Sequence, residues 1–165
     1  MKRTEAILVA GGNSGDAERL LAEAERGIER MAGEIKARSE IYRTPSWGFV
    51  SDDFLNRAFV VETPLGAEEL LDAVQAVERA AGRDRQAEAQ ERGVTGQRYA
   101  SRPMDIDIIF YGDEVIDTPR LRVPHPLLAE RMFVLRPLNE ITPGKVHPLT
   151  GATVREMYLA LENEK

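Results

Sequence analysis

The stretch RPMDIDIIFYGD, residues 102–113, is an apolar run of strand length that is interrupted by two aspartates. Because side chains in a strand alternate between faces, Asp105 and Asp107 should share one face. The alternation predicts Ile109 and Tyr111 on that face and, on the other, Met104, Ile106, Ile108 and Phe110. Two carboxylates on a half-buried strand repel each other and resist desolvation, so something positive must compensate them.

Two kinds of positive partner fit this acidic pair. A divalent cation is the first. Two rises of ~3.3 Å separate the two backbone positions by roughly 6.6 Å, so the carboxylates can converge on one hard ion. Mg²⁺ held by one or two carboxylates and by substrate phosphates is usual in nucleotide chemistry, and two-metal clamps are common. The alternative is that the aspartates pair with arginines such as Arg102 on a solvated sheet face. The D-x-D spacing alone leaves both open.

Before this strand, the hydrophobic pattern predicts strand, helix, strand, strand and helix in that order. The expected strands cover residues 5–10, 35–44 and 53–63. A first helix over 16–34 has Asp16 as its N-cap, and a second over 66–82 stops at Gly82, a natural C′ residue. A polar loop is expected over 82–101, and loops of this length tend to be functional or disordered.

After the acidic strand, the pattern predicts a short strand over 114–118, a proline-rich turn, a helical turn near 126–131 and a last helix near 153–163. Thr153 and Glu156 form a T-x-x-E capping box for that helix. The order β-α-β-β-α-β predicts an α+β, ferredoxin-like fold, in which an antiparallel sheet carries helices on one face, with C-terminal additions. The fold class alone says nothing about chemistry.

Composition limits the classes of protein to consider. The chain has 165 residues, 42% of them hydrophobic, which suits one domain over 1–165. It has no cysteines, no run near the ~20 apolar residues of a membrane span and no secretory signal, so we expect a soluble cytoplasmic protein. The net charge of −6 argues against a general nucleic-acid binder. Arginines concentrated over 79–102 and 120–136 suit a polyphosphate, unless they are the solvated surface of a protein from a GC-rich genome.

On the second predicted helix, Gln75 and Glu78 lie three residues apart on the flank beside the core stripe. They could read a nucleobase or ribose while Arg83 and Arg85 hold phosphates, although an ordinary solvated flank explains them too. The glycine-rich GGNSGD, residues 11–16, lacks the lysine and hydroxyl of a Walker motif, so we expect a turn there.

The segment YRTPSWGFVSDDFLN, residues 42–56, gathers Trp47, Phe54 and Asn56 around a Thr-Pro turn. Aromatic and amide groups can stack on and hydrogen-bond a flat heterocycle, although core packing explains the two aromatic residues nearly as well. His125 lies between prolines in VPHP and could face a phosphate. His147 is expected to be an ordinary surface or loop histidine.

In order, and over nearly the whole chain, these pieces resemble the 6-hydroxymethyl-7,8-dihydropterin pyrophosphokinase (HPPK) family of folate biosynthesis. The matching segments are GGNSGD, IYRTPSWG, DFLN, QAVE followed by GRDR, RYASRPMDIDIIFYG, RLRVPHP and RMFVLRPL. The resemblance implies a ferredoxin-like fold, two Mg²⁺ ions, and ATP as co-substrate. It implies diphosphate transfer from ATP to the pterin hydroxymethyl group, with release of AMP and with no nucleic-acid or membrane partner. The oligomeric state stays open, with a monomer as the working expectation.

The resemblance also implies roles for individual residues. Asp105 and Asp107 would be ligands of the two magnesium ions. Catalytic arginines facing the phosphates would be Arg83, Arg98 and Arg102. The implied ATP contacts are Gln75, Glu78, Arg85, Arg98, Ile108, Arg120, Arg122, His125 and Arg131. The implied pterin pocket is Thr44, Pro45, Trp47, Phe54, Asn56, Tyr99 and Phe133.

Some positions depart from the family pattern. Tyr99 falls where a tryptophan is usual, Ser101 where proline is common and Arg122 where threonine is common, and the loop over 86–97 looks longer than typical. The resemblance implies in-line attack of the pterin hydroxyl on the β-phosphorus, with no obvious general base and with the long loop closing once both substrates are bound. Two rival functions stay open: a non-catalytic ferredoxin-like module that senses a phosphorylated metabolite, and a metal-dependent phosphodiesterase that uses the two aspartates.

Overall fold

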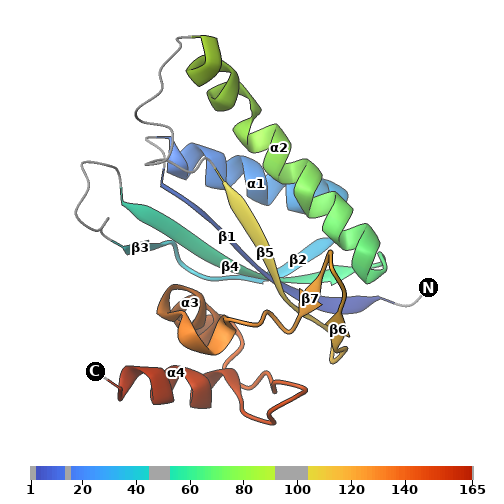
Figure 1. Ribbon diagram of the computed structural model, residues 1–165, viewed down its shortest axis with the longest axis vertical. Helices are drawn as coiled ribbons and strands as arrows, with labels where there is room; N and C mark the ends of the chain where they lie inside the picture. Colours follow the sequence, from blue (N-terminus) through green and yellow to red (C-terminus); the bar gives the residue numbers. More distant parts are fainter. Residues whose placement is uncertain (1–2, 14–15, 45–52, 92–103, 165) are drawn as a thin grey trace.

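The computed structural model describes residues 3–13, 16–44, 53–91 and 104–164, and of residues 82–91 it describes the backbone alone. An antiparallel five-stranded sheet lies between two layers of helices (Figure 1). Its strands are β1 (Thr4–Gly12), β2 (Glu34–Arg38), β3 (Tyr42–Thr44), β4 (Phe54–Thr63) and β5 (Asp105–Tyr111). The strand order is β2-β4-β1-β5, with β3 also paired to β4, so β5 is an edge strand.

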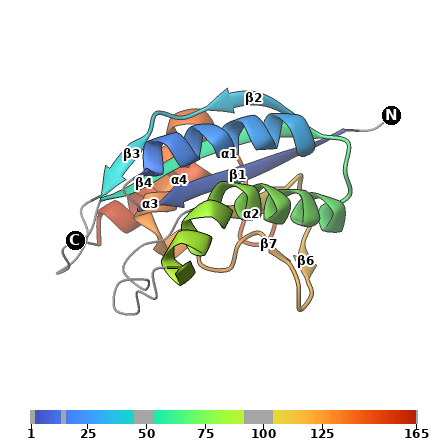
Figure 2. The same cartoon turned by 90° about the horizontal axis from the view of Figure 1, so that it is seen from above.

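One face of the sheet is covered by α1 (Ala17–Met31) and α2 (Ala67–Glu91), which lie side by side in Figure 2. Even-numbered residues of β1 such as Leu8 pack with Leu20 and Leu21 of α1 and with Val74 of α2 in one buried cluster. The period of 3.6 in both helices and of 2 in β1 directs these side chains into a single apolar layer.

The other face is covered by α3 (Met132–Ile141) and α4 (Val154–Glu162) (Figure 1). Their buried side chains pack with odd-numbered residues of β1, such as Ile7, in a second cluster. The expectation of helices on one face was therefore wrong, because the C-terminal additions form a second helical layer. The sequence pattern missed α3, whose interior holds Pro137, a residue that usually ends a helix.

The second helix is longer than predicted. It passes through Gly82 and ends at Glu91, so the first ten residues of the expected loop over 82–101 are helical. A glycine inside a helix costs only about 1 kcal/mol relative to alanine. The residues after it are mostly arginine, glutamine, glutamate and alanine, which are strong helix formers and offset that cost.

The predicted strand over 35–44 is two strands, β2 and β3, which pair with different parts of β4. Between them the Ser39 hydroxyl accepts a hydrogen bond from Ala58 N (3.0 Å), and Ser39 N donates to Ala58 O (2.9 Å). Glu140 of α3 accepts from Glu40 N (3.1 Å). These contacts end the ladder of β2 with β4 and connect the bend to α3. The hydrophobic pattern does not contain a signal for such contacts.

A β-bulge changes the alternation in β5. The register with β1 shifts between Ile7 and Leu8, which leaves Ile109 as the extra residue on β5. Ile109 and Phe110 therefore both pack toward α3 and α4, whereas Tyr111 belongs to the other cluster. The predicted faces of Phe110 and Tyr111 were wrong for this reason, and those of residues 104–109 follow the simple alternation.

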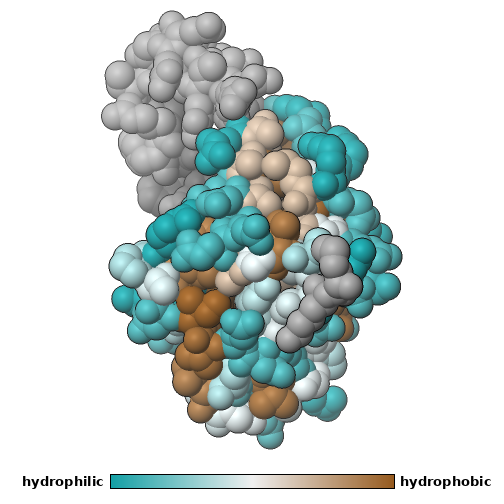
Figure 3. All heavy atoms as spheres, turned by 90° about the vertical axis from the view of Figure 1, so that its right-hand side faces the viewer, coloured by the Kyte–Doolittle hydropathy of each residue, from teal (hydrophilic) through white to brown (hydrophobic). Residues whose placement is uncertain are grey.

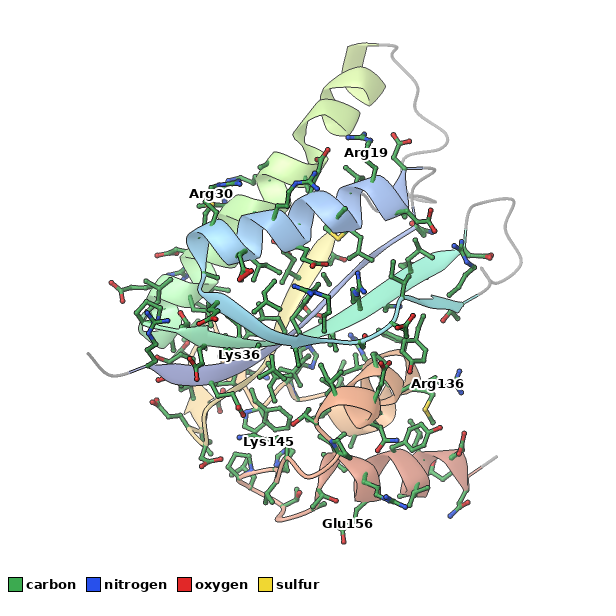
Figure 4. All side chains as sticks on the ribbon, turned by 180° about the vertical axis from the view of Figure 1, so that it is seen from behind. Arg19, Arg30, Lys36, Arg136, Lys145 and Glu156 are labelled. Atoms are coloured by element: carbon green, nitrogen blue, oxygen red, sulfur yellow. The ribbon has the colours of Figure 1, made fainter. Side chains whose placement is uncertain are left out.

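The remaining elements are β6 (Ile116–Asp117) and β7 (Arg122–Val123), which pair with each other, and a short 3-10 helix, η2 (Leu128–Glu130). The capping box of α4 is confirmed: Thr153 Oγ1 accepts from Glu156 N (3.1 Å), and Glu156, labelled in Figure 4, accepts from Thr153 N (2.8 Å). Asp16 occupies the N-cap of α1, but its side chain makes no capping hydrogen bond.

The surface drawn in Figure 3 is mixed, with apolar patches separated by hydrophilic residues. The large apolar side chains that are most exposed include Leu149 and Val115. Among the described helices, none is long and apolar enough to cross a membrane.

Candidate active site

Four residues from neighbouring strands form one row across the sheet, which we call the site row. Tyr42 of β3 pairs with Asn56 of β4, Asn56 pairs with Gly11 of β1, and Gly11 pairs with Asp105 of β5. Directly paired residues of antiparallel strands lie on the same face. The site row therefore lies on the face that carries α3 and α4, and it brings a predicted pterin residue, Asn56, to within two strands of a predicted metal ligand, Asp105.

Asp107 belongs to the next row along the strands, where it pairs with Val9. Both aspartates are half-buried on the edge strand. Val9 is part of the apolar cluster under α3 and α4. The predicted common face of Asp105 and Asp107 is thus confirmed, and the pair marks the boundary between that cluster and the site row.

His125 is held against the same strand. Its backbone N donates to Ile109 O (2.9 Å), and its Nδ1 accepts from Leu127 N (3.2 Å), which leaves Nε2 as the protonated nitrogen of the neutral ring. Burial lowers the pKa of His125, while the negative charge of Asp107 raises it and the positive charge of Arg131 lowers it. The ring is therefore a neutral Nε2–H donor within the electrostatic reach of Asp107.

Glu78 of α2 reaches the outer edge of β5. Its Oε2 accepts from Ile106 N (2.6 Å), a backbone donor that an edge strand would otherwise leave without a ladder partner. Burial raises the pKa of the Glu78 carboxyl, the N–H of Ile106 opposes the shift, and the negative charges of Asp105 and Asp107 add to it. Three carboxyl groups thus gather around the start of β5, a set of oxygen ligands that suits a hard cation.

Of the predicted pterin residues in the described chain, Thr44 and Phe54 lie beside the site row, and Phe133 lies at the start of α3. Thr44 pairs with Phe54, one row beyond Tyr42 and Asn56 and on the same face. Phe133, at the start of α3, is 43% exposed, and the Arg131 guanidinium lies 5.6 Å from the centre of its ring. An aromatic ring that stays exposed beside a cation is available for stacking on a flat ligand.

Arg120 and Arg122 lie elsewhere, on the β6–β7 hairpin. Arg120 forms ion pairs with Glu68 and Asp72 in the first turns of α2 (2.7 Å each). Arg122 pairs with Asp117 (3.1 Å). Both are exposed, so these pairs are weak and could exchange for phosphates, but the structure does not bring either arginine into contact with Asp105 or Asp107.

The family model of 7,8-dihydro-6-hydroxymethylpterin-pyrophosphokinase (HPPK) matches residues 7–143, a range that includes the site row, both aspartates and His125. The chain belongs to this family. It is 38% identical over 161 residues to the 2-amino-4-hydroxy-6-hydroxymethyldihydropteridine pyrophosphokinase of Methylorubrum extorquens, a match that covers 96% of this chain and 94% of that one. The enzyme of that name from Aquifex aeolicus is 37% identical over 147 residues, covering 88% and 85%.

Solved structures agree with this HPPK family assignment at the level of the fold. Wild-type Plasmodium falciparum HPPK-DHPS with pterin and p-hydroxybenzoate superposes with a TM-score of 0.73 at 16% identity, covering 99% of this chain. This chain spans only 44% of that longer HPPK-DHPS chain. At such low identity the likeness concerns the fold alone.

Several of the residues that the HPPK resemblance singles out lie outside the described residues. These are Pro45, Trp47, Arg98, Tyr99 and Arg102. The backbone at Arg83 and Arg85 is described, and it is helical rather than the start of a loop, but their side chains are not. The roles of all seven stay predictions.

Gln75 and Ile108 have contrasting surroundings. Gln75 is half-buried on α2, one turn before Glu78, and so shares the flank that faces the start of β5. The side chain of Ile108 is 5% exposed and packs in the cluster beneath α1 and α2. Any ATP contact at this position would therefore use the backbone of the edge strand rather than the isoleucine side chain.

The donor set suits magnesium only as an incomplete site. Among the residues that the structure describes, no group of three His, Cys, Asp or Glu side chains is arranged to hold a metal ion. Mg²⁺ in phosphate-transfer sites takes one or two carboxylates and completes its shell with phosphate oxygens and water. Asp105 and Asp107 fit that pattern, because they are two carboxylates that share a face.

Two site features escaped the sequence analysis. The Tyr42 hydroxyl donates to Glu140 Oε1 (2.8 Å), and burial together with this carboxylate raises the pKa of Tyr42 to about 12. Glu140 is 98 residues away, so no local pattern could have linked the two. Gly11 lies at the centre of the site row, where the sequence suggested only the start of a turn.

Proposed function

We propose that this chain transfers a diphosphate group from ATP to the hydroxymethyl group of 6-hydroxymethyl-7,8-dihydropterin, releasing AMP, as a step of folate biosynthesis. The observation that carries the proposal is the site row in a member of the HPPK family, in which Asn56 and Asp105 lie on either side of Gly11. An amide can hydrogen-bond the edge of a heterocycle, and a carboxylate can bind the metal ions that hold phosphates. The row therefore provides one group for each of the two substrates.

At the phosphate end, Asp105 and Asp107 would hold magnesium, and we propose two ions. When bound, Mg²⁺ supplies charge neutralisation for the triphosphate and polarises its oxygens. His125 supports this assignment, because its neutral Nε2–H can donate to a phosphate oxygen without adding a second cation. Arg131 lies beside it and adds positive charge from the start of α3.

At the heterocycle end, we propose that Asn56 hydrogen-bonds the pterin while Phe54 and Phe133 contact its faces, with Thr44 beside them. The support is that Thr44, Phe54 and Asn56 share one face. Pro45, Trp47 and Tyr99 would complete the pocket. Stacking between aromatic rings excludes water from a flat ligand and orients it, which is most of what phosphoryl-type transfer asks of a protein.

ATP would lie along the start of β5 with Gln75 and Glu78 at its nucleoside side. The further ATP contacts we propose are Arg83, Arg85, Arg98, Arg102, Ile108, Arg120 and Arg122. The hydroxymethyl oxygen then attacks the β-phosphorus and releases its proton to water, the bond between the β-phosphorus and the oxygen bridging to the α-phosphorus breaks, and AMP leaves with that oxygen. Positioning and charge neutralisation account for such a step without a strong general base.

We also propose that the order β2-β4-β1-β5, with α1 and α2 on one face, is the ferredoxin-like arrangement, and that residues 1–165 act as one domain. The cytoplasmic location and the monomeric state stay predictions from the sequence.

The test is the identity of the nucleotide product. The protein is incubated with Mg²⁺, ATP and the reduced pterin, and nucleotides are separated by ion-exchange chromatography. We expect AMP in amounts equal to the pterin diphosphate formed, and none when the pterin is left out. ADP as the product would indicate transfer of a single phosphoryl group and contradict the proposal. Binding of an ATP analogue with no turnover would favour a phosphate-sensing module instead, and cleavage of a cyclic nucleotide without pterin would favour a phosphodiesterase.

A further inference from the structure

Gly11 is the residue that joins the two ends of the site row. It pairs with Asn56 on one side and with Asp105 on the other. With neighbouring strands ~4.8 Å apart, the backbones of Asn56 and Asp105 are separated by roughly 10 Å, and Gly11 lies between them. Any side chain at this position would therefore stand on the face of the sheet between these two residues.

A glycine is needed here because of space and not because of backbone conformation. Gly11 is not among the described glycines with positive φ, so its backbone is one that any residue can adopt. A Cβ at Gly11 would overlap Asn56 Oδ1 and would lie 3.0 Å from Asn56 Cγ. It would also lie 2.8 Å from the backbone oxygen of Leu55. The Asn56 amide thus occupies the volume that a side chain at residue 11 would fill.

The Asn56 amide is directed along the site row. Asn56 is only 6% exposed, so the amide lies in an enclosed part of the sheet surface. A side-chain amide offers donors and an acceptor side by side, so it can pair with the edge of a flat heterocycle. Because Oδ1 lies over β1, the amide is turned from its own strand toward the strand of Asp105.

We propose that Gly11 is a positioning residue that sets substrate specificity: its missing side chain seats the Asn56 amide over β1, in line with Asp105. This placement suits a flat heterocycle that offers an amide or amidine edge to Asn56 and carries its reactive hydroxymethyl group toward Asp105. The inference rests on the proposed function and adds to it the residue that fixes the direction of the heterocycle. A side chain at residue 11 would turn the amide away and misalign the acceptor hydroxyl.

The experiment is a double-mutant cycle between Gly11 and Asn56, read out as steady-state kinetics for each substrate. Gly11→Ala should lower kcat/KM for the pterin by roughly 10- to 100-fold while KM for ATP changes by less than about twofold. The matched control is Gly144→Ala, since a Cβ there meets nothing within 4 Å, and it should behave as wild type.

The decisive comparison uses Asn56→Ala as the background. Because that change removes the two amide atoms in conflict with a Cβ, adding Gly11→Ala should cost less than about threefold more in kcat/KM for the pterin. Additive losses would overturn the inference, since they would mean that Gly11 acts through something other than Asn56. Unchanged kinetics in Gly11→Ala would overturn it as well.

Folding is checked by circular dichroism and thermal melting. If Gly11→Ala alone fails to fold but the double variant folds, the conflict with the amide is supported. If both fail to fold, the contact with Leu55 O governs, and the inference is wrong. Failure of the proposed function itself is distinguishable, because the wild-type protein would then form no AMP from ATP and pterin.

Discussion

The two faces of the sheet are built from the same strands but differ in how they are covered. Under α1 and α2 the apolar cluster runs from Ala6 to Ala10 on β1 and draws on every strand except β3, with Arg57 as a polar exception that pairs with Glu25 of α1 (3.3 Å). Under α3 and α4 the apolar cluster reaches only as far as Val9 and Ala58. Two residues further along the strands, the same face carries Asn56, Gly11 and Asp105. One face stabilises the fold, and the other divides its area between stability and a site.

This difference explains why polar groups are tolerated on β5. β5 is an edge strand, and the apolar cluster of the second layer reaches Val9, opposite Asp107, but not Gly11, opposite Asp105. Burial of two carboxylates under a full apolar layer would cost several kcal/mol each without compensation. The second face can thus hold ligand-binding groups because the first face supplies a complete core.

Among the substitutions that test this difference between the two faces, the replacement of Asp107 should have the largest effect. Replacing Asp107 with alanine should lower kcat by at least about 100-fold, because a ligand of the magnesium that would neutralise the transferring phosphates is lost. The fold should survive, since removing a carboxylate beside Glu78 also relieves repulsion. Turnover is measured as AMP release and folding by thermal melting.

Asp113→Ala is the matched control for Asp107→Ala. Asp113 follows β5 on the outside of the molecule and pairs with Lys145, labelled in Figure 4, at 2.9 Å. Its loss should leave turnover unchanged. Activity like that of the wild type in Asp107→Ala would refute the metal assignment and leave ion pairing with arginines as the account of the acidic pair.

A pair of leucines compares the two layers directly. Leu21 of α1 is 1% exposed and Leu135 of α3 is 0% exposed. Replacing either with alanine should lower the free energy of unfolding by about 2–5 kcal/mol, measured by urea titration. Only Leu135→Ala should also raise KM for the pterin, by a few fold, because α3 carries Phe133. If the two changes have equal effects on KM for the pterin, the α1–α2 layer affects pterin binding as much as the α3–α4 layer does, and the proposed difference between the layers is wrong.

The cap of α4 should have a smaller effect. Thr153→Ala removes the acceptor of Glu156 N and should lower the free energy of unfolding by about 1 kcal/mol, with no change in turnover. Thr153→Ser keeps the hydroxyl and should restore most of the loss. If the serine variant is as unstable as the alanine variant, the methyl group of Thr153 and not its cap is what stabilises α4.

The sequence predicted the parts of this molecule whose signals are local. The shared face of Asp105 and Asp107, the helix α1 and the Thr153–Glu156 box all follow from spacing over a few residues, and the order of the motifs predicted the family. Signals that compete locally led to errors. Gly82 indicated an end that the helix formers beyond it override, and Pro137 concealed α3.

Other features depend on contacts that no local pattern contains. The bulge at Ile109 arises from the register between β5 and β1, and it reverses the faces of Phe110 and Tyr111. The role of Gly11 depends on which residue of β4 lies opposite, which is 45 positions away in the chain. The sequence could therefore predict Asn56 and Asp105 as site residues, but the part of Gly11 between them can be inferred only once the pairing of the strands is known.

The smallest effect is expected at His147, in the layer under the second face. Its ring lies edge-on to Phe110, with centroids 6.1 Å apart, and its Nδ1 accepts from Leu149 N (3.2 Å) and Thr150 N (3.3 Å). Burial lowers the pKa of His147 below its ordinary value of 6.5. Just below pH 6.5 the unfolded chain therefore binds more protons at this residue than the folded chain does, so stability is lost as the pH falls through that value.

His147→Asn should reduce this loss, because asparagine can accept a hydrogen bond through Oδ1 and does not titrate. The measurement is the free energy of unfolding of both proteins at pH 8 and at pH 5.5. His125 also has a lowered pKa and adds a loss of the same sign, whereas the raised pKa of Glu78 acts in the opposite direction, so the difference between variant and wild type isolates His147. If the variant loses as much stability as the wild type on acidification, His147 either stays neutral or is equally exposed in the folded and unfolded states. The pH dependence of stability would then arise from the residues of the candidate site alone.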